Sequence, residues 1–419
     1  MSRMFTFSAY GVAMQSLRRE LGVVGSMSIG IAAMLGAGVF FVWTPAFQLA
    51  GEWMLLSLAI AAVVATLNGL VTTQLAMNQP VSGGIYSYGR HYRGPLVGFM
   101  AGWFFLTGKT GSAAAIALIA ATYLVPDYAN IVAAGLIAVF TAVVISGIRT
   151  TATISVVIAT VVIVGLLALA LPSLPQAAGL SSQTAPGLGV LTAAGLMFFA
   201  FAGYARMATL GEEVRDPRRT LPRAIVGALA IVLVVYAVVG VALLPKFQAS
   251  GAPDAPLEAL VGSGNAVLVT GLAVVACLGS LLAILAGLSR TGLQMARHRD
   301  IPGLLSRISE GTKGPLAAEI TVGLVAIVLV LTTDPLWLVG LSSTGVLAYY
   351  AIGHYSALAQ PASERFLPVA VPVIGLVLCG LLVATLPLAS LLAGLAWSAA
   401  GVAWFVFTRR GRRQVSSEF

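Results

Sequence analysis

Side chains that could do acid–base, nucleophilic or metal chemistry are scarce in the long apolar stretches of this sequence. An enzyme that cleaves its substrate within such apolar stretches would need paired aspartates, a zinc-binding motif or a serine–histidine pair. His91 and His298 lie in basic stretches and His354 lies near the end of an apolar run, and no acidic residue falls near the middle of such a run. We therefore expect no enzyme, and no catalytic residue, cofactor or metal site.

One ionisable side chain does lie deep in an apolar run. Lys109 is about 15 residues past Gly94, which is ~22 Å along a helix. A lone ammonium at that depth is costly unless it has a polar partner. Lys109 could carry a coupled proton or a fixed charge beside a substrate cavity, or it could bond to carbonyls of a broken helix or snorkel. Because intramembrane ionisable residues are functional by default, we take Lys109 as the coupling candidate.

Glycine interrupts two of the apolar runs. The first interruption lies in Leu35–Phe40, which contains Gly36 and Gly38, and the other lies in Leu196–Tyr204, which contains Gly203. Broken helices at matching positions of two inverted repeats indicate the substrate site of a transporter. The alternative is that these glycines only let neighbouring helices pack closely.

Composition predicts which secondary-structure elements carry these residues. The chain of 419 residues is 59% hydrophobic and 9% charged, with a mean hydropathy of +0.98. Soluble proteins carry about 25% charged residues, so this composition predicts an integral membrane protein. The uncharged runs between charged residues accommodate twelve helices of ~20 residues and leave no room for a soluble domain.

The basic residues predict the orientation. With an even number of spans both termini lie on one side, and 20 of the 23 basic residues fall on that side. The positive-inside rule makes that side cytoplasmic, in the inner (plasma) membrane. The net charge of +9 follows from this asymmetry, so we expect no nucleic-acid partner. Cys277 and Cys379 both lie in apolar runs, which excludes a disulfide framework.

Three segments together carry a family resemblance. They are the Leu35–Phe40 break, Gln79–Tyr88 leading through Arg93–Pro95 to Gly102–Trp103, and Phe199–Tyr204 followed by Glu212–Ile225. The segment from Gln79 to Tyr88 is similar to a Pro-x-Ser-Gly-Gly-x-Tyr loop, and the block that ends at Ile225 is long and specific. Together they resemble the amino acid, polyamine and organocation (APC) permeases. The resemblance covers the first ten spans in order, and the last two add only hydropathy.

The resemblance implies an all-α polytopic fold of the LeuT type, with two inverted five-helix repeats and two further helices. Unwinding of the first helix would free backbone N–H groups for a carboxylate, and unwinding of the sixth would free carbonyls for an ammonium. Phe199 and Tyr204 are the gating candidates by resemblance, with core packing as the alternative. The expected substrate-binding residues are Gly36, Ala37, Gly38, Phe199, Ala200, Phe201, Ala202 and Gly203. The expected segments are 1–20 as a cytoplasmic N-terminal segment, 21–173 and 188–360 as the two repeats, 366–408 as helices 11 and 12, and 409–419 as a cytoplasmic basic tail.

Two departures from the family pattern limit what carries over. The fifth span has no lysine, so coupling through such a lysine does not transfer, and Ala205 stands where relatives often have glutamate. Without a carboxylate in the core there is no evident receptor for a second ammonium or a guanidinium. This favours neutral amino acids over cationic amino acids and polyamines.

These features predict a secondary active transporter that moves amino acids by alternating access, with proton coupling and exchange both open. A substrate-gated channel and a non-transporting nutrient receptor on the same fold are the alternatives. The expected partners are the amino acid, the lipid bilayer and, if coupling is to protons, protons. Both a monomer and a homodimer are compatible with the sequence.

Overall fold

We describe the protein from a computed structural model. It describes residues 21–79, 83–146, 152–177, 185–204, 207, 214–261, 265–309 and 314–415. In these ranges the chain is helical, and the one extended contact is a parallel bridge between Leu21 and Val214. The predicted all-α class is confirmed.

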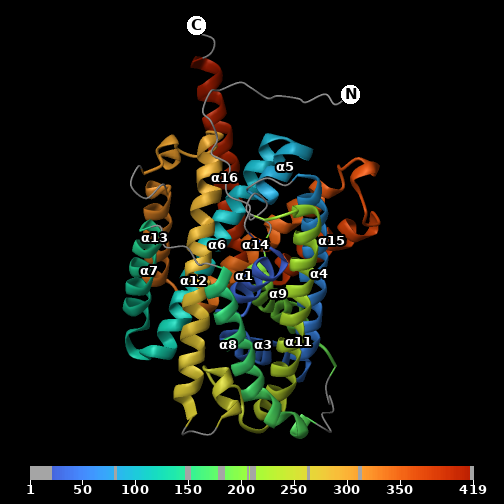
Figure 1. Cartoon of the computed structure of the whole chain (residues 1–419), viewed down its shortest axis with the longest axis vertical. Coiled ribbons are helices and arrows are strands. Elements are labelled where there is room, and N and C mark those ends of the chain that lie inside the picture. The colour runs from blue at the N-terminus through green and yellow to red at the C-terminus, as the bar shows by residue number, and fades with distance from the viewer. Residues whose placement is uncertain are drawn as a thin grey trace.

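The long helices run side by side along the long axis of the molecule (Figure 1). The α-helices are α1 Val23–Met34, α2 Ala37–Phe41, α3 Trp43–Ala50, α4 Met54–Asn78, α5 Ile85–Arg93, α6 Pro95–Leu124, α7 Ala129–Ile145, α8 Ala152–Ala170, α9 Gly189–Phe201, α11 Pro217–Ser250, α12 Ala266–Arg297, α13 Leu316–Thr332, α14 Pro335–Ala357, α15 Ala370–Thr385 and α16 Leu388–Val415. Short 3-10 turns connect or end them: η1 Gly51–Trp53, η2 Pro126–Tyr128, η3 Leu171–Ala177, η4 Ala202–Tyr204, η5 Pro256–Leu260, η7 Gly303–Ser306 and η8 Ala362–Glu364.

Twelve of these segments have the character of membrane spans. Within the described residues, nine are long and apolar enough to cross a bilayer, and three shorter apolar helices occur at Gly189–Tyr204, Leu316–Thr332 and Ala370–Thr385. The run 366–408 divides at Pro387, between α15 and α16, as its proline predicts. The protein is therefore a polytopic helical membrane protein.

Burial separates central helices from peripheral ones. In α6, 83% of the most apolar window is buried, whereas the corresponding figure for α7 and for α16 is 17%. The peripheral helices expose aliphatic side chains such as Val139, Leu324 and Leu395. Lipid accepts such a surface, so these helices need no polar outer face.

The central helices α6 and α14 pack with almost no side chain between them. A Cβ atom on Gly345 would lie 2.7 Å from the Cα of Gly108. Ser112 of α6 and Ser342 of α14 are hydrogen-bonded across the same interface, with their hydroxyl oxygens 2.6 Å apart. Small residues and interhelical hydrogen bonds are the usual basis of tight packing in membranes. The tight packing of α6 against α14 fixes the positions of the residues that follow Gly108.

The amphipathic helix α5 caps the end of the molecule at which α16 also ends (Figure 1). Arg90 and Tyr86 both donate to Oδ2 of Asp300, at 2.9 Å and 2.8 Å. Trp404 of α16 donates its indole N–H to the backbone carbonyl of Asp300 at 2.9 Å. Burial, together with the neighbouring Asp300 carboxylate, raises the pKa of Tyr86 above its usual range, so this hydroxyl remains a donor. The turn after α12 is thereby tied to both α5 and α16.

Candidate functional site

Both predicted helix breaks are present, and they lie against each other. α1 ends at Met34 and α2 begins at Ala37, while α9 gives way to the turn η4 at Ala202. A Cβ atom on Gly38 would lie 2.5 Å from the Cα of Ala200. A Cβ atom on Gly203 would collide with the backbone of Ala33 and Met34. Glycine is thus required at both points by close backbone approach.

Side chains from neighbouring helices satisfy the carbonyls that the first break leaves without helical partners. Ser280 of α12 donates to the Ala32 carbonyl at 2.7 Å. The Tyr236 hydroxyl of α11 lies between two carbonyl oxygens, 2.7 Å from Met34 and 3.0 Å from Ala200. A hydroxyl has one proton to donate, so only one of these two carbonyls is satisfied at a time. Tyr236 therefore bridges the two broken helices.

Lys109 satisfies a carbonyl of the second break. Its ammonium donates to the Ala202 carbonyl at 2.7 Å, and the side chain is only 4% exposed. Such charge-assisted bonds are stronger than neutral ones, which offsets part of the cost of burying the charge. The bond is what the structural interpretation of Lys109 predicted, and it also places the charge at the edge of a cavity.

A small cavity lies between the breaks and α6. Its lining within the described residues is Ala33, Met34, Ala37, Gly38, Lys109, Ser112, Ile116, Phe199, Gly203 and Ile284. Its volume is about 10 Å³, on the order of what one water molecule needs. This set of residues contains one positive charge and no carboxylate. The cavity is closed in this conformation, and it must widen before an amino acid can fit.

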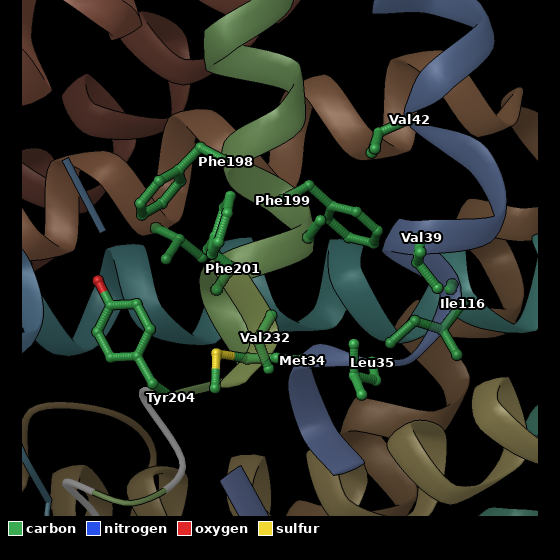
Figure 2. Packing of buried hydrophobic residues seen from close by; sticks show 14 of the residues in the cluster. Met34, Leu35, Val39, Val42, Ile116, Phe198, Phe199, Phe201, Tyr204 and Val232 are labelled. Atoms are coloured by element: carbon green, nitrogen blue, oxygen red, sulfur yellow. The ribbon is translucent and has the colours of Figure 1, made fainter. Parts of the chain in front are cut away.

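The aromatic side chains of α9 and η4 point in different directions (Figure 2). Phe199 points toward Val39 and Ile116 and lines the cavity. Phe201 packs edge-on against Tyr236, with ring centroids 5.1 Å apart. Tyr204 lies on the other side and stacks on Tyr350 at 5.0 Å. Of the two gating candidates, the structure brings only Phe199 to the cavity.

Some of the remaining predicted site residues line the cavity and others do not. Ala37, Gly38, Gly203 and Lys109 line the cavity. Gly36 instead makes room for the Ser280 side chain, and Ala200 packs against Gly38. Ala202 contributes its carbonyl to Lys109 rather than a cavity wall.

Sequence reasoning missed the side chains that satisfy the breaks. Tyr236 and Ser280 lie in long apolar helices without any local motif. Ser112 could have been found, because it lies one helical turn after Lys109. Ala205 and the start of the Glu212–Ile225 block lie outside the described residues.

Comparison with known proteins agrees with this geometry. The sequence model of the family described as "Amino acid permease" matches residues 21–408. An uncharacterised transporter of Mycobacterium tuberculosis is 43% identical over 417 residues, which cover 96% of this chain and 95% of that protein. A branched-chain amino acid permease of Bacillus subtilis is 25% identical over 94% of both chains. The vacuolar cationic amino acid transporter 4 of Arabidopsis thaliana is 28% identical over 79% of this chain and 61% of its own length.

The family match covers nearly every span and includes both helix breaks and the cavity between them. The chain belongs to the amino acid permease family of the APC superfamily.

Proposed function

We propose that this protein is a secondary active transporter that carries neutral amino acids across the plasma membrane by alternating access, with both termini in the cytoplasm. The observation that carries this proposal is the cavity between the two helix breaks, whose charged lining consists of Lys109 without any carboxylate. Membership of the amino acid permease family supports the same substrate type.

The two ends of a zwitterionic amino acid have complementary partners at this site. The carboxylate would lie near the Lys109 ammonium and the backbone N–H groups at the start of α2. The ammonium would meet carbonyl oxygens of the α9–η4 break. The aliphatic lining, including Ile116 and Ile284, suits an apolar side chain.

Charge argues for the neutral class over the cationic one. A substrate with a second positive group would face the Lys109 ammonium with no acidic residue in the cavity lining to compensate. Relatives are named for both classes, a branched-chain amino acid permease and cationic amino acid transporters. The cavity lining favours neutral substrates, as in the name of the branched-chain amino acid permease.

Alternating access follows from which contacts can separate. The α6–α14 pair is held by the Gly108–Gly345 contact and the Ser112–Ser342 hydrogen bond. The side chains that donate to carbonyls of α1 and α9, Tyr236 and Ser280, lie on α11 and α12 rather than on α6 or α14. We propose that α1, α2 and α9 move against α6 and α14, and that this movement opens the cavity first to one side and then to the other.

The test is counterflow in proteoliposomes loaded with one unlabelled amino acid and exposed to the same labelled one. A panel of neutral, cationic and acidic amino acids and polyamines is compared at zero membrane potential and zero pH gradient. We expect neutral amino acids to exchange and the others to exchange weakly or not at all. Binding without exchange would indicate a receptor, and flux without trans-stimulation would indicate a channel; either outcome would reject the transporter proposal.

Two substitutions separate the roles of Lys109. Lys109→Met removes both the charge and the bond to Ala202, whereas Lys109→Gln keeps a donor but no charge. If the charge serves substrate or proton binding, both variants lose roughly tenfold or more of exchange, the expected cost of about 1.4 kcal/mol or more. Lys109→Gln exchange at the wild-type rate and with the wild-type pH dependence would reduce Lys109 to a structural donor.

A further inference from the structure

A second polar region, apart from the cavity, lies between α4 and the chain from the end of α14 to the turn η8. His354 Nε2 is 2.7 Å from Asn68 Oδ1, Gln74 Nε2 is 2.7 Å from Gln360 Oε1, and Asn78 Nδ2 is 2.7 Å from the Glu364 carbonyl oxygen. The two partners are 286 residues apart in every one of these pairs. A constant separation means that the two segments run in the same direction in one register. We call this set of three bonds the α4–α14 ladder.

The first of these bonds joins His354 to Asn68, and the imidazole ring fills a closely fitting space. We call the space around His354, Asn68, Gly375 and Cys379 the slot. His354 is completely buried, and Asn68 Oδ1 also accepts from the Cys379 thiol at 3.3 Å. A Cβ atom on Gly375 would collide with the imidazole ring, so α15 gives the ring its space by having a glycine there. Gly375 and Cys379 are one helical turn apart on α15. Two neighbouring helices therefore position the ring.

Two polar atoms of the His354–Asn68 pair are buried without a hydrogen-bond partner among the described residues, Nδ1 of His354 and Nδ2 of Asn68. With Nε2–H donating to Asn68, a neutral imidazole presents Nδ1 as a bare acceptor. Orphaned buried polar atoms are rare and costly, and a bare Nδ1 on a completely buried ring indicates a site that takes up something polar.

The polar groups at the His354–Asn68 pair are neutral. Asn68 of α4 contacts the ring and accepts from Cys379 of α15, and the Tyr204 hydroxyl of η4 lies close to Asn68 and to Tyr350 of α14. No Asp, Glu, Lys or Arg in the described part of the chain pairs with the ring. An imidazolium enclosed there would have no counter-ion, which is unfavourable until water enters.

The slot is connected to the cavity through one short turn. Tyr204 ends the turn η4, whose first residue, Ala202, accepts the hydrogen bond of Lys109. Gly203, between them, lines the cavity. A movement of η4 that opens the cavity must therefore also move the Tyr204 ring at the slot.

We propose that His354 is a proton-binding site of the transport cycle, separate from Lys109; this inference rests on the transport function proposed above. When η4 moves and water reaches the slot, Nδ1 accepts one proton from hydronium and releases water, and the ring becomes an imidazolium with two N–H donors. When the slot closes, the proton returns to water. Low pH therefore holds the protein in the hydrated, open arrangement.

The test uses the fact that the chain has three histidines. Counterflow of a transported neutral amino acid is measured from about pH 5 to 8, the range in which an unperturbed histidine titrates, with equal pH on both sides. Each protein is normalised to its own rate at the alkaline end. We expect the wild-type rate to fall roughly threefold or more toward acid pH.

Three variants show which histidine causes the fall in exchange rate at acid pH. His354→Gln can still donate to Asn68 but cannot take up a proton, so its profile should be flat. His91→Gln and His298→Gln, at exposed positions, are the matched controls and should keep the wild-type profile. A fall that persists in His354→Gln, or a flat wild-type profile, would overturn the proposal.

Asn68→Asp provides a directional test. A carboxylate against Nε2 stabilises the imidazolium, so the acid fall should move to higher pH. If this variant does not fold, the comparison of His354→Gln with the wild type still decides whether His354 causes the fall in exchange rate at acid pH.

If no amino acid exchanges in the wild type, the proposed transport function fails, and the inference is judged on its own by thermal unfolding in detergent. The wild type should lose more thermal stability than His354→Gln between about pH 8 and 5, because water reaches the ring on unfolding. Equal losses would overturn the proton site.

Discussion

The broken-helix site and the α4–α14 ladder satisfy their buried polar groups in opposite ways. At the breaks, side chains such as Tyr236, Ser280 and Lys109 donate to backbone carbonyls that the helix ends leave open. In the ladder, side chains pair with other side chains or with a distant carbonyl, and the helices themselves stay intact. Each of these three donors has an acceptor, whereas the His354–Asn68 pair of the ladder leaves His354 Nδ1 and Asn68 Nδ2 unpaired among the described residues.

The two regions therefore differ in which of their hydrogen bonds can be exchanged. A broken helix leaves carbonyls open in any conformation, so a substrate ammonium could replace Lys109 at the Ala202 carbonyl when the substrate carboxylate in turn accepts from Lys109. A side-chain pair has no such substitute in a dry interior, and water has to enter when the pair separates. The site at the breaks is thus suited to a ligand, and the ladder is suited to water and protons.

The largest expected effect is that of Gly38→Val at the breaks. The new side chain would push against the Ala200 backbone, and overpacking of this kind costs about 1–3 kcal/mol. We expect counterflow to fall roughly tenfold or more in proteoliposomes. Gly271→Val on α12, where a Cβ atom has nothing within 4 Å, is the matched control and should exchange normally. Normal exchange by Gly38→Val would remove the close approach of the two breaks from the mechanism.

A smaller effect compares one tyrosine from each region. Tyr236→Phe removes the one donor that the Met34 and Ala200 carbonyls share and should lower the free energy of unfolding by about 1–3 kcal/mol. Tyr350→Phe removes a hydroxyl that has no partner among the described residues and should change it by less than about 0.5 kcal/mol. Both side chains are 1% exposed, so burial is matched. The free energies of unfolding of both variants are measured in detergent. Equal losses in Tyr236→Phe and Tyr350→Phe would contradict the difference between the two regions.

The smallest effect is the pH dependence at the Glu364 end of the ladder. Tyr92 donates to Glu364 at 2.6 Å and accepts from Gln360 at 3.3 Å. Burial, followed by the bond to Glu364, raises the pKa of Tyr92 from 10.0 to about 12. The folded state therefore holds this proton more tightly, so the stabilisation is complete below pH 10 and is lost as the pH rises toward 12.

Tyr92→Phe tests this sign. The difference in unfolding temperature between wild type and variant should be constant below pH 10 and should narrow between pH 10 and 12. A difference that stays constant up to pH 12 would show that folding does not raise the pKa of Tyr92.

Glycine spacing predicted the breaks correctly, because close backbone approach at Gly38 and Gly203 admits no side chain. The direction of the aromatic residues could not be predicted. Phe199, Phe201 and Tyr204 lie on one short segment, yet they meet the cavity, Tyr236 and Tyr350 respectively. Their surroundings come from α6, α11 and α14, which are distant in sequence.

Composition and glycine spacing are enough to predict a membrane protein, its helices and the points at which two helices break. Low charge and long apolar runs require lipid, lipid requires complete backbone hydrogen bonding, and glycine at Gly36, Gly38 and Gly203 permits the exceptions. Which donors reach the open carbonyls, and which polar atoms stay unpaired, depends on how the helices pack. Lys109 and Ala202 are 93 residues apart, and His354 and Asn68 are 286 apart. Such contacts arise from the packing of whole helices, for which the local sequence carries no signal.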